Sequence, residues 1–244
     1  MNGTRAALVW AHIAHQAKGA PPSMAHLCAA AVAEVDVDGA AITVLAGPTR
    51  QDTLHASNQS AGDLEEWQLI LGQGPSLDAF AGGGPVLAAD LESAEYLTRW
   101  SAFTRSALDG GARALFALPM QVGAIRLGVL SLYRSRAGGL SPLELADALA
   151  YADAAVLLLL DAAAGLTPDA AEFAWQGIDP TAHRAQVHQA TGMVLAQLGV
   201  GADAAFARLR AYAYANDRSL GDVARDVVER RLRFAPDPLP GSIG

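Results

Sequence analysis

The chain has 244 residues, of which 52% are hydrophobic and 17% charged, and its formal net charge is −8. This length fits one large or two modest domains, and the apolar content indicates packed cores rather than a largely disordered chain. Purely apolar runs such as residues 154–160 are too short to cross a bilayer. A single cysteine, Cys28, cannot form an internal disulfide and no secretory signal is indicated, so we expect a cytoplasmic protein without membrane contact.

Charge is distributed unevenly along the chain. Residues 183–244 hold 8 arginines and 6 acidic residues, whereas residues 1–182 hold 9 of the 17 basic and 19 of the 25 acidic residues. An acidic body followed by a mildly basic C-terminal quarter fits contact with a polyanion. It fits equally well a set of solvated helix faces whose arginines pair with neighbouring acids.

The first 140 residues are predicted to alternate between helices and strands. Helices are expected over 5–17, 22–35, around 64–71, from 77 to 80 and over 100–110, and strands over 39–44, 51–58, 85–89, 114–122 and 127–133. The order lacks a regular strand–helix–strand rhythm. It therefore favours an α+β sheet domain over a doubly wound one.

A longer helix is predicted to begin at Ser141, because Ser141, Pro142 and Glu144 form a capping pattern. Apolar residues three or four apart then make one seam along residues 141–164: Leu145, Leu149, Ala152, Val156 and Leu160. The seam either covers the domain's own sheet or pairs with a second chain.

The C-terminal part is predicted to be all helical. Residues 165–179, with Thr167-Pro168 and Gly177, are interpreted as a linker. Helices are expected over 180–198, 202–215 and 219–234, the last capped by Ser219 with Asp222 three residues on. Each of these helices has one apolar face, so together they can form a small bundle.

The segment 189–228, QATGMVLAQLGVGADAAFARLRAYAYANDRSLGDVARDVV, resembles the ANTAR domain, the RNA-binding module of bacterial transcription antitermination regulators. The matching residues are Ala190, Gly192, Met193, Ala205, Phe206, Leu209, Arg210, Ala213, Asn216, Leu220, Val223 and Ala224. Thr191 departs from the pattern, because many family members carry lysine there. The resemblance implies that paired ANTAR domains bind a two-hairpin RNA and so prevent a terminator from forming.

Residues 22–164 resemble a GAF domain through VDGAAITVL, LGQGPSLDAF and ALFALPMQVGAIRLGVLSLYR. In the second stretch, Ser76 stands where related sequences often have cysteine. The resemblance implies an antiparallel sheet flanked by helices, and a sensor that holds a small molecule between the sheet and the helices over it. The expected order is a helical extension (1–21), a GAF-like sensor (22–164), a linker (165–179), a three-helix ANTAR bundle (180–235) and a tail (236–244).

Candidate site residues follow from these resemblances and from residue chemistry, since guanidinium groups hold phosphates and small residues let RNA approach closely. For RNA they are Gln189, Ala190, Gly192, Arg210, Ala213, Asn216 and Arg218. Tyr212 and Tyr214 offer aromatic faces, but two residues apart on a helix they point to different sides, and at most one is expected to stack. For a ligand in the sheet domain they are Trp67, Phe80, Trp100, Phe103, Phe116 and Met120, whose alternative role is an ordinary filled core.

Catalysis, a metal and a cofactor are not indicated. The histidines and Cys28 form no metal-binding pattern, the glycines at 82–84 lack the lysine and hydroxyl of a P-loop, and G-x-S-x-G does not occur. We therefore expect a ligand-responsive RNA-binding antiterminator, dimeric through helix 141–164 and the ANTAR helices. One alternative is a DNA-binding transcription factor, which the glycine and acid at the start of the last helix disfavour. Another is a sensor or dimerisation protein without nucleic-acid binding, which Thr191 and the low net basicity keep open.

Overall fold

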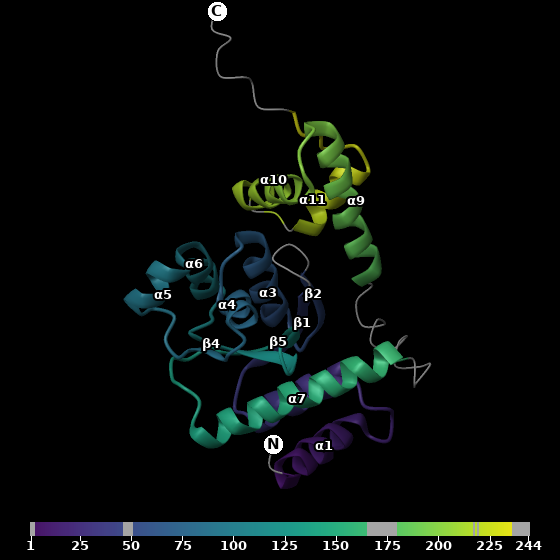
Figure 1. Ribbon diagram of the computed structural model, residues 1–244. Helices are drawn as coiled ribbons and strands as arrows, with labels where there is room; N and C mark the ends of the chain where they lie inside the picture. The colour runs from purple at the N-terminus through teal and green to yellow at the C-terminus, as the bar shows by residue number, and fades with distance from the viewer. Residues whose placement is uncertain (1–2, 46–50, 165–179, 217, 219, 236–244) are drawn as a thin grey trace, which may run out of the picture. The chain divides into compact units, whose positions relative to one another are not determined.

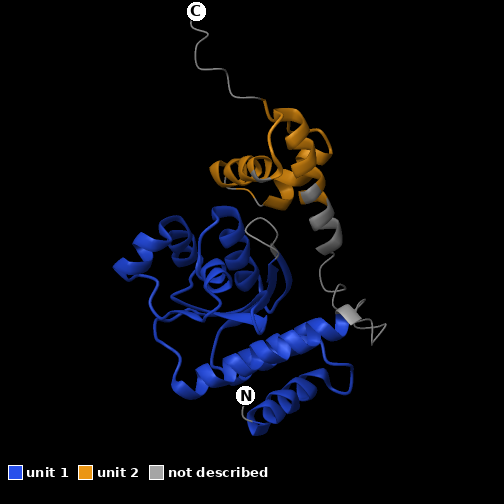
Figure 2. Cartoon of the chain, in the orientation of Figure 1, with its two compact units in different colours: residues 1–178 blue, residues 179–244 orange. Residues whose placement is uncertain are grey.

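The computed structural model describes residues 3–45, 51–164, 180–216, 218 and 220–235. The chain divides into two compact units, unit 1 (residues 1–178) and unit 2 (residues 179–244), which Figure 2 distinguishes by colour. The boundary falls at the C-terminal end of the segment expected to be a linker. That segment, 165–179, and the expected tail, 236–244, lie outside the described residues, so both assignments stay predictions.

Unit 1 is built on a five-stranded antiparallel sheet with strand order β2-β1-β5-β4-β3 (Figure 1). The strands are β1 (Gly39–Leu45), β2 (Gln51–Ala56), β3 (Val86–Ala88), β4 (Ala114–Val122) and β5 (Ile125–Arg134). β5 pairs with β4 over its whole length and with β1 through residues 128–133. The predicted α+β class, with an antiparallel sheet ahead of an all-helical unit, is confirmed.

Helices cover both faces of this sheet (Figure 1). On one side lie α1 (Gly3–Ala17), α2 (Met24–Glu34) and α7 (Pro142–Ala164), and on the other α3 (Gln59–Leu71), α4 (Pro75–Gly82), α5 (Ala94–Arg99) and α6 (Ser101–Asp109). Side chains alternate along β4, so Phe116 enters the core under α2 and α7, whereas Leu115 enters the core under α3 and α6. Two separate apolar cores result.

Unit 2 is a helical bundle formed by α9 (Pro180–Leu198), α10 (Ala202–Ala215) and α11 (Leu220–Val228). Its fully buried side chains recur three or four residues apart on each helix: Ala190, Val194, Ala205, Leu209, Ala213, Val223, Ala224 and Val227. The predicted bounds of the first two helices are confirmed. Ser219, predicted as the cap of the last helix, lies outside the described residues.

One helix prediction is wrong in extent, and one helix was not predicted. The last helix ends at Val228 rather than at residue 234, because Arg230 adopts a left-handed conformation (φ 61°) and the amides of Arg231 and Leu232 both donate to the Asp226 carbonyl. The prediction for residues 100–110 missed the preceding helix α5. Trp100 stands between α5 and α6 with a non-helical backbone (φ −130°, ψ 55°).

The predicted start of α7 is a capping box. The Ser141 hydroxyl accepts from the Glu144 amide (3.2 Å), and the Glu144 carboxylate accepts from the Ser141 amide (2.6 Å). Hydrogen bonding of the Glu144 carboxylate by the Ser141 hydroxyl and the Ser141 amide lowers the pKa of Glu144. The same carboxylate accepts from the guanidinium of Arg134 on β5 (2.7 Å), which is 3% exposed, so the cap also ties α7 to the sheet.

The apolar seam of α7 is only partly used within unit 1. Ala152 and Val156 are buried under the sheet and Leu145 packs against them at the margin of the core. Leu149, Leu157 and Leu160 are 37%, 50% and 44% exposed. Ala152 and Val156 thus fit the first alternative, in which the seam covers the sheet of its own domain. The exposed leucines fit the second, in which α7 pairs with another chain.

The sequence LGQGPS builds a tight turn between α3 and α4. Gly72 ends α3 in the left-handed conformation (φ 64°), and Gly74 has φ 143°, which residues with a side chain rarely adopt. A Cβ on Gly74 would lie 2.5 Å from Cγ of Gln68. The turn thereby brings the amide of Ser76 within 2.7 Å of the Gln68 side-chain oxygen.

We expect Gly74→Ala to destabilise the protein by about 1–3 kcal/mol, because it combines backbone strain with a clash against Gln68. Urea unfolding of the purified variant measures this. Gly62→Ala is the matched control: Gly62 lies inside α3, and its added Cβ would meet only the Ala56 methyl at 3.7 Å. The control should be neutral or slightly stabilising, and equal destabilisation by both substitutions would contradict the role of the turn.

Candidate nucleic-acid interface and sensor site

The turn between α10 and α11 positions two of the candidate RNA-binding residues. The Asn216 side-chain amide donates to the Tyr212 carbonyl at the end of α10 (2.8 Å), and the Arg218 amide donates to the Ala213 carbonyl (3.0 Å). Asn216 is exposed and Arg218 is partly exposed. These bonds end α10 and fix the place of both side chains on the surface of unit 2.

Several arginines of unit 2 pair with acidic side chains of the same unit. The Asp226 carboxylate accepts from Arg218 (2.6 Å) and from Arg231 (2.6 Å), and Asp222 accepts from Arg225 (2.9 Å). Accordingly, the hydrogen bonds from Arg218 and Arg231 lower the pKa of Asp226, and the bond to Asp226 raises the pKa of Arg218. Arg218 is therefore present at the surface as half of an ion pair.

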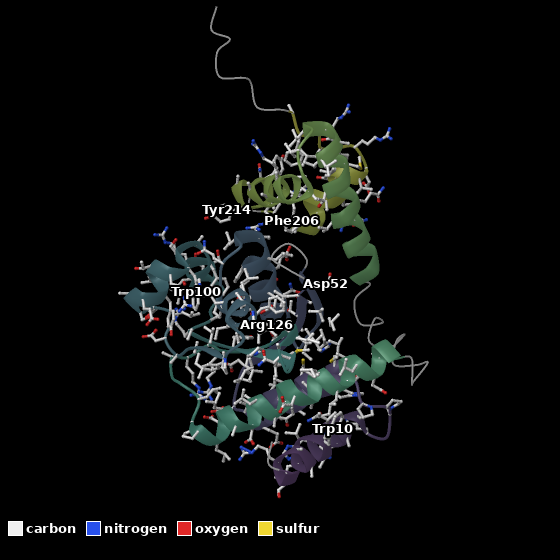
Figure 3. The ribbon with its side chains drawn as sticks, in the orientation of Figure 1. Trp10, Asp52, Trp100, Arg126, Phe206 and Tyr214 are labelled. Carbon is white, nitrogen blue, oxygen red and sulfur yellow. The ribbon has the colours of Figure 1, made fainter. Side chains whose placement is uncertain are left out.

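Aromatic side chains of α10 have two different environments. The Tyr212 ring packs edge-to-face against Phe234 (centroids 5.5 Å apart), whose amide donates to Gln197 of α9 (2.8 Å). Tyr214 is 60% exposed, whereas Phe206 is buried at 6% exposure; Figure 3 labels both on α10. Tyr214 is thus the one of the two candidate tyrosines with an open ring.

The remaining candidate RNA residues separate by burial. Ala190 and Ala213 are fully buried in the bundle, so their side chains cannot contact RNA in this conformation and instead permit close helix packing. Gln189 and Gly192 are exposed, and helical spacing places them on the side of α9 away from Ala190 and its contacts with α10 and α11. The predicted set therefore does not form one surface on a single unit 2. Arg210 lies on α10, and Asn216 and Arg218 lie in the turn that follows it, whereas Gln189 and Gly192 belong to the outer face of α9.

Thr191 stands where the ANTAR pattern often has lysine. Its hydroxyl donates to the Val187 carbonyl one turn earlier (2.7 Å), so its side chain is engaged by its own helix. The position supplies neither a cation nor a hydroxyl donor directed at a ligand.

The six candidate ligand residues of unit 1 do not line one site. Trp67, Phe80, Trp100 and Phe103 pack in the core under α3 to α6, but Phe116 and Met120 pack in the core on the opposite face of the sheet. The prediction that Phe116 and Met120 share a pocket with the other four is wrong, because residues at even positions of β4 point under α2 and α7. Trp100 is tied to α4, since its indole N–H donates to Asp78 (3.0 Å).

A buried polar cluster, missed at the sequence level, joins the sheet to α3 and α4. Its centre is the Glu65 carboxylate, which is 1% exposed. Oε2 of Glu65 accepts from Thr43 (2.8 Å), and Oε1 accepts from Gln68 (2.9 Å) and Ser76 (3.0 Å). The Ser76 hydroxyl also bonds the Ser131 hydroxyl of β5 (2.8 Å). Ser76, which stands where related sequences often have cysteine, thus contributes its hydroxyl to the hydrogen bonds of this cluster.

Burial raises the pKa of Glu65, and the surrounding hydroxyl and amide donors only partly oppose that effect. Beside the carboxylate is a cavity of about 10 Å³, bordered by residues that include Ala41, Ala61 and Ser131. This volume is about that needed for one water molecule. None of the six predicted ligand residues lines this cavity.

Metal-binding geometry is not found in the described parts of the two units, where no three His, Cys, Asp or Glu side chains gather as a metal site. Cys28 is fully buried, and burial raises the pKa of its thiol. Among the helices that the structure describes, none has both the length and the apolar character needed to cross a bilayer.

Residues 181–228 match the family model of the ANTAR domain. The chain carries an ANTAR domain. The matched region takes in α10, α11 and all but the first residue of α9, which are the elements that build the core of unit 2. The sequence-based resemblance is confirmed for this region. Curated proteins, by contrast, yield no match to the chain.

Solved structures similar to the chain include several GAF domains. The GAF domain of a phosphoenolpyruvate-protein phosphotransferase from Coxiella burnetii is 13% identical, with a TM-score of 0.49, over 68% of this chain and 100% of that chain. GAF3 from Slr1393 of Synechocystis sp. PCC6803 is 18% identical (TM-score 0.42, 55% of this chain and 91% of that chain). The nlh2 GAF domain of A. Aeolicus is 15% identical (TM-score 0.41, 64% and 95%).

Replacing Glu65 by glutamine removes the buried titrating group while keeping its shape. Because the folded state has the higher pKa, it binds the proton more tightly than the unfolded chain. Protonated Glu65 therefore contributes fully to the free energy of unfolding at pH values below the pKa of the carboxyl group in the unfolded chain. This contribution is lost as the pH rises through the higher pKa of Glu65 in the folded state. We expect the Tm of wild type minus that of Glu65→Gln to fall by a few degrees between about pH 4 and about pH 8.

Thermal unfolding across this pH range measures the difference. Glu95→Gln, an exposed carboxylate on α5, is the matched control and should show no such trend. A difference between wild type and Glu65→Gln that is flat, or that increases with pH, would contradict a raised pKa.

Proposed function

We propose that this protein is a transcription antitermination regulator in which a dimeric ANTAR domain binds hairpin RNA, while the GAF-like unit 1 responds to a small-molecule signal. The observation that carries the proposal is the match of residues 181–228 to the ANTAR domain. Regulation, rather than catalysis, is the role that this combination of domains implies. The exposed polar residues at the end of α10 supply a surface suited to unpaired nucleotides.

Arg210, Asn216 and Arg218 are the residues proposed to contact RNA most directly. They lie in sequence order along the last turns of α10 and in the turn that follows it. The Arg210 guanidinium lies over the Phe206 ring at 5.8 Å from its centroid, which holds the side chain along the helix. Arg218 would contact RNA while it remains paired with Asp226. The carboxylate would then orient the guanidinium, and the guanidinium would supply the positive charge.

A DNA-binding role has less support from α11. A recognition helix in a major groove needs long polar side chains in its first turns. Here Leu220 and Gly221 are buried and Asp222 pairs with Arg225, so the described start of α11 offers a carboxylate to the phosphates. A sensor without nucleic-acid binding is the stronger alternative, because it would account for the internal pairing of Arg218, Arg225 and Arg231.

Self-association is proposed to use the exposed leucines of α7 together with the ANTAR helices. Leu149, Leu157 and Leu160 form an α7 strip that unit 1 itself leaves exposed. Pairing this strip with its copy would bury apolar area and bring two ANTAR domains onto one RNA. On α9, the outer face with Gly192 and the 37% exposed Leu195 is the corresponding surface.

The signal is proposed to act at the sheet face covered by α3 and α4. In the present conformation its cavity of about 10 Å³ excludes any organic ligand, so binding would require α3 or α4 to move away from the sheet. The Glu65 cluster is what such a movement would break, because it joins β1 and β5 to both helices.

The first test is binding to RNA selected from a pool of paired hairpins with randomised loops. We expect the wild type to prefer a selected RNA over duplex DNA of equal length. Arg210→Ala should weaken binding about 10-fold and reduce the slope of log Kd against log salt by about 1, because one phosphate contact is lost. Arg233→Ala, an exposed arginine after α11, is the control and should bind within about twofold of wild type.

Fluorescence anisotropy at several salt concentrations gives both quantities, and circular dichroism checks the fold. Failure to select any RNA would contradict the proposed function and favour the sensor alternative. A preference for duplex DNA would favour the transcription-factor alternative.

The second test concerns the α7 strip. Leu157→Glu places a charge in the middle of the strip, so we expect it to convert a dimer to a monomer, which light scattering after size-exclusion chromatography detects. Ile125→Glu is the matched control, since Ile125 is an apolar side chain that is 66% exposed but lies on β5, away from α7 in the sequence. A wild type that is monomeric at micromolar concentration, or a dimer that survives Leu157→Glu, would exclude this interface.

A further inference from the structure

One side of α10 carries an aromatic, a guanidinium and a second aromatic at intervals of four residues. These are Phe206, Arg210 and Tyr214, here called the α10 strip. Residues four apart lie one above the other on a helix. Phe206 is 6% exposed and anchors the strip in the bundle, Arg210 is half-buried above its ring, and Tyr214 is 60% exposed at the end (Figure 3).

The exposure of Tyr214 is unusual among the aromatic residues of unit 2. Phe206 is in the core, and Tyr212 is covered by Phe234. The residues flanking Tyr214 on the outer side of α10 are alanines, Ala207, Ala211 and Ala215, all exposed. Methyl groups are too small to cover the ring. A planar aromatic face therefore stands open to solvent beside a guanidinium.

The neighbouring guanidinium, that of Arg210, is partly buried and lies next to an aromatic ring. Burial lowers the pKa of Arg210 from its usual high value, and its guanidinium lies over the Phe206 ring at 5.8 Å from the centroid. A partly desolvated arginine next to an open aromatic face presents both a π surface and a cation. That combination suits a nucleotide, whose base is planar and whose phosphate is anionic.

We propose that Tyr214 is the platform on which one unpaired base of the bound RNA stacks, with Arg210 contacting the phosphate or base edge beside it. The proposal rests on the proposed RNA-binding function and adds a contact that the motif-derived residue set lacks. An apolar protein partner would also cover Tyr214. The two members of the α10 strip that reach the surface are an aromatic ring, Tyr214, and a cation, Arg210, which favours an anionic, aromatic occupant over an apolar one.

The test compares two substitutions at one position. Tyr214→Phe keeps the aromatic face and removes only the hydroxyl, whereas Tyr214→Leu keeps apolar bulk and helix propensity but removes the π face. The ligand is an RNA selected by the wild-type protein from the pool of paired hairpins, and each loop adenine in turn is replaced by 2-aminopurine. Its fluorescence falls when the base stacks on an aromatic ring.

We expect Tyr214→Phe to bind within about twofold of wild type and to quench the same 2-aminopurine. Tyr214→Leu should bind at least about fivefold more weakly and lose that quenching, since stacking on an aromatic ring contributes this much or more per base. The salt dependence should be unchanged in Tyr214→Leu, because no phosphate contact is removed, in contrast to Arg210→Ala. Both variants should melt at the wild-type temperature, since the ring is mostly exposed.

Three outcomes would overturn the proposal. Tyr214→Leu could bind and quench as wild type does, in which case no base stacks there. Tyr214→Phe and Tyr214→Leu could be weakened equally, in which case the hydroxyl rather than the ring makes the contact. If the wild type selects no RNA at all, the proposed function itself fails, and this is seen before any variant is made. A repeat with Tyr214→Gln, which also lacks a ring, keeps the comparison decisive if the leucine variant is unstable.

Discussion

The sheet of unit 1 is covered by helices on both faces, and most features of that unit follow from this constraint. Every central strand must supply apolar side chains in both directions, so β4 feeds Phe116 and Met120 into one core and Leu115 into the other. In the described part of unit 1, the cavity beside Glu65 has a volume of only about 10 Å³. The Glu65 cluster places polar groups in this interior, and its bonds from Glu65 to Thr43 and from Ser76 to Ser131 hold α3 and α4 against the sheet. Burial of the Glu65 carboxylate costs free energy, which the surrounding hydroxyl and amide donors offset only in part.

The elements with strong local signals could be predicted, and those that depend on tertiary contacts could not. The capping box at Ser141 and Glu144 depends on only four consecutive residues, and the structure contains it as predicted. The end of α11 at Val228 depends instead on the chain turning back so that Phe234 reaches Tyr212, which periodicity does not report. Glu65 was missed for a similar reason, because a glutamate on an amphipathic helix normally faces water and its partners Thr43 and Ser131 are distant in sequence.

The candidate RNA site likewise has features that the sequence predicts and features that depend on tertiary contacts. Family resemblance selects positions, but it does not distinguish a residue that builds the bundle from one that contacts a ligand. Ala190 and Ala213 match the ANTAR pattern and are core residues, whereas Tyr214 is not part of the matched pattern and is exposed. The choice between Tyr212 and Tyr214 needed the fold, since it depends on Phe234 covering one ring and on alanines leaving the other open.

The charge balance of unit 2 bears on how such a surface would gain affinity. Arg218, Arg225 and Arg231 already have carboxylate partners within the described part of the bundle, so fewer cations are available to release counterions from RNA than the sequence suggests. Electrostatic attraction alone would then give weak binding that disappears at moderate salt. Stacking of an unpaired base on an aromatic ring does not depend on net charge, and two linked copies of the domain multiply a modest affinity when both engage one transcript. In the proposed function, a weakly basic ANTAR domain would gain affinity from an open ring and from a partner copy. Among the described residues, Tyr214 offers the ring, and the α7 strip and the outer face of α9 are the proposed contacts with the copy.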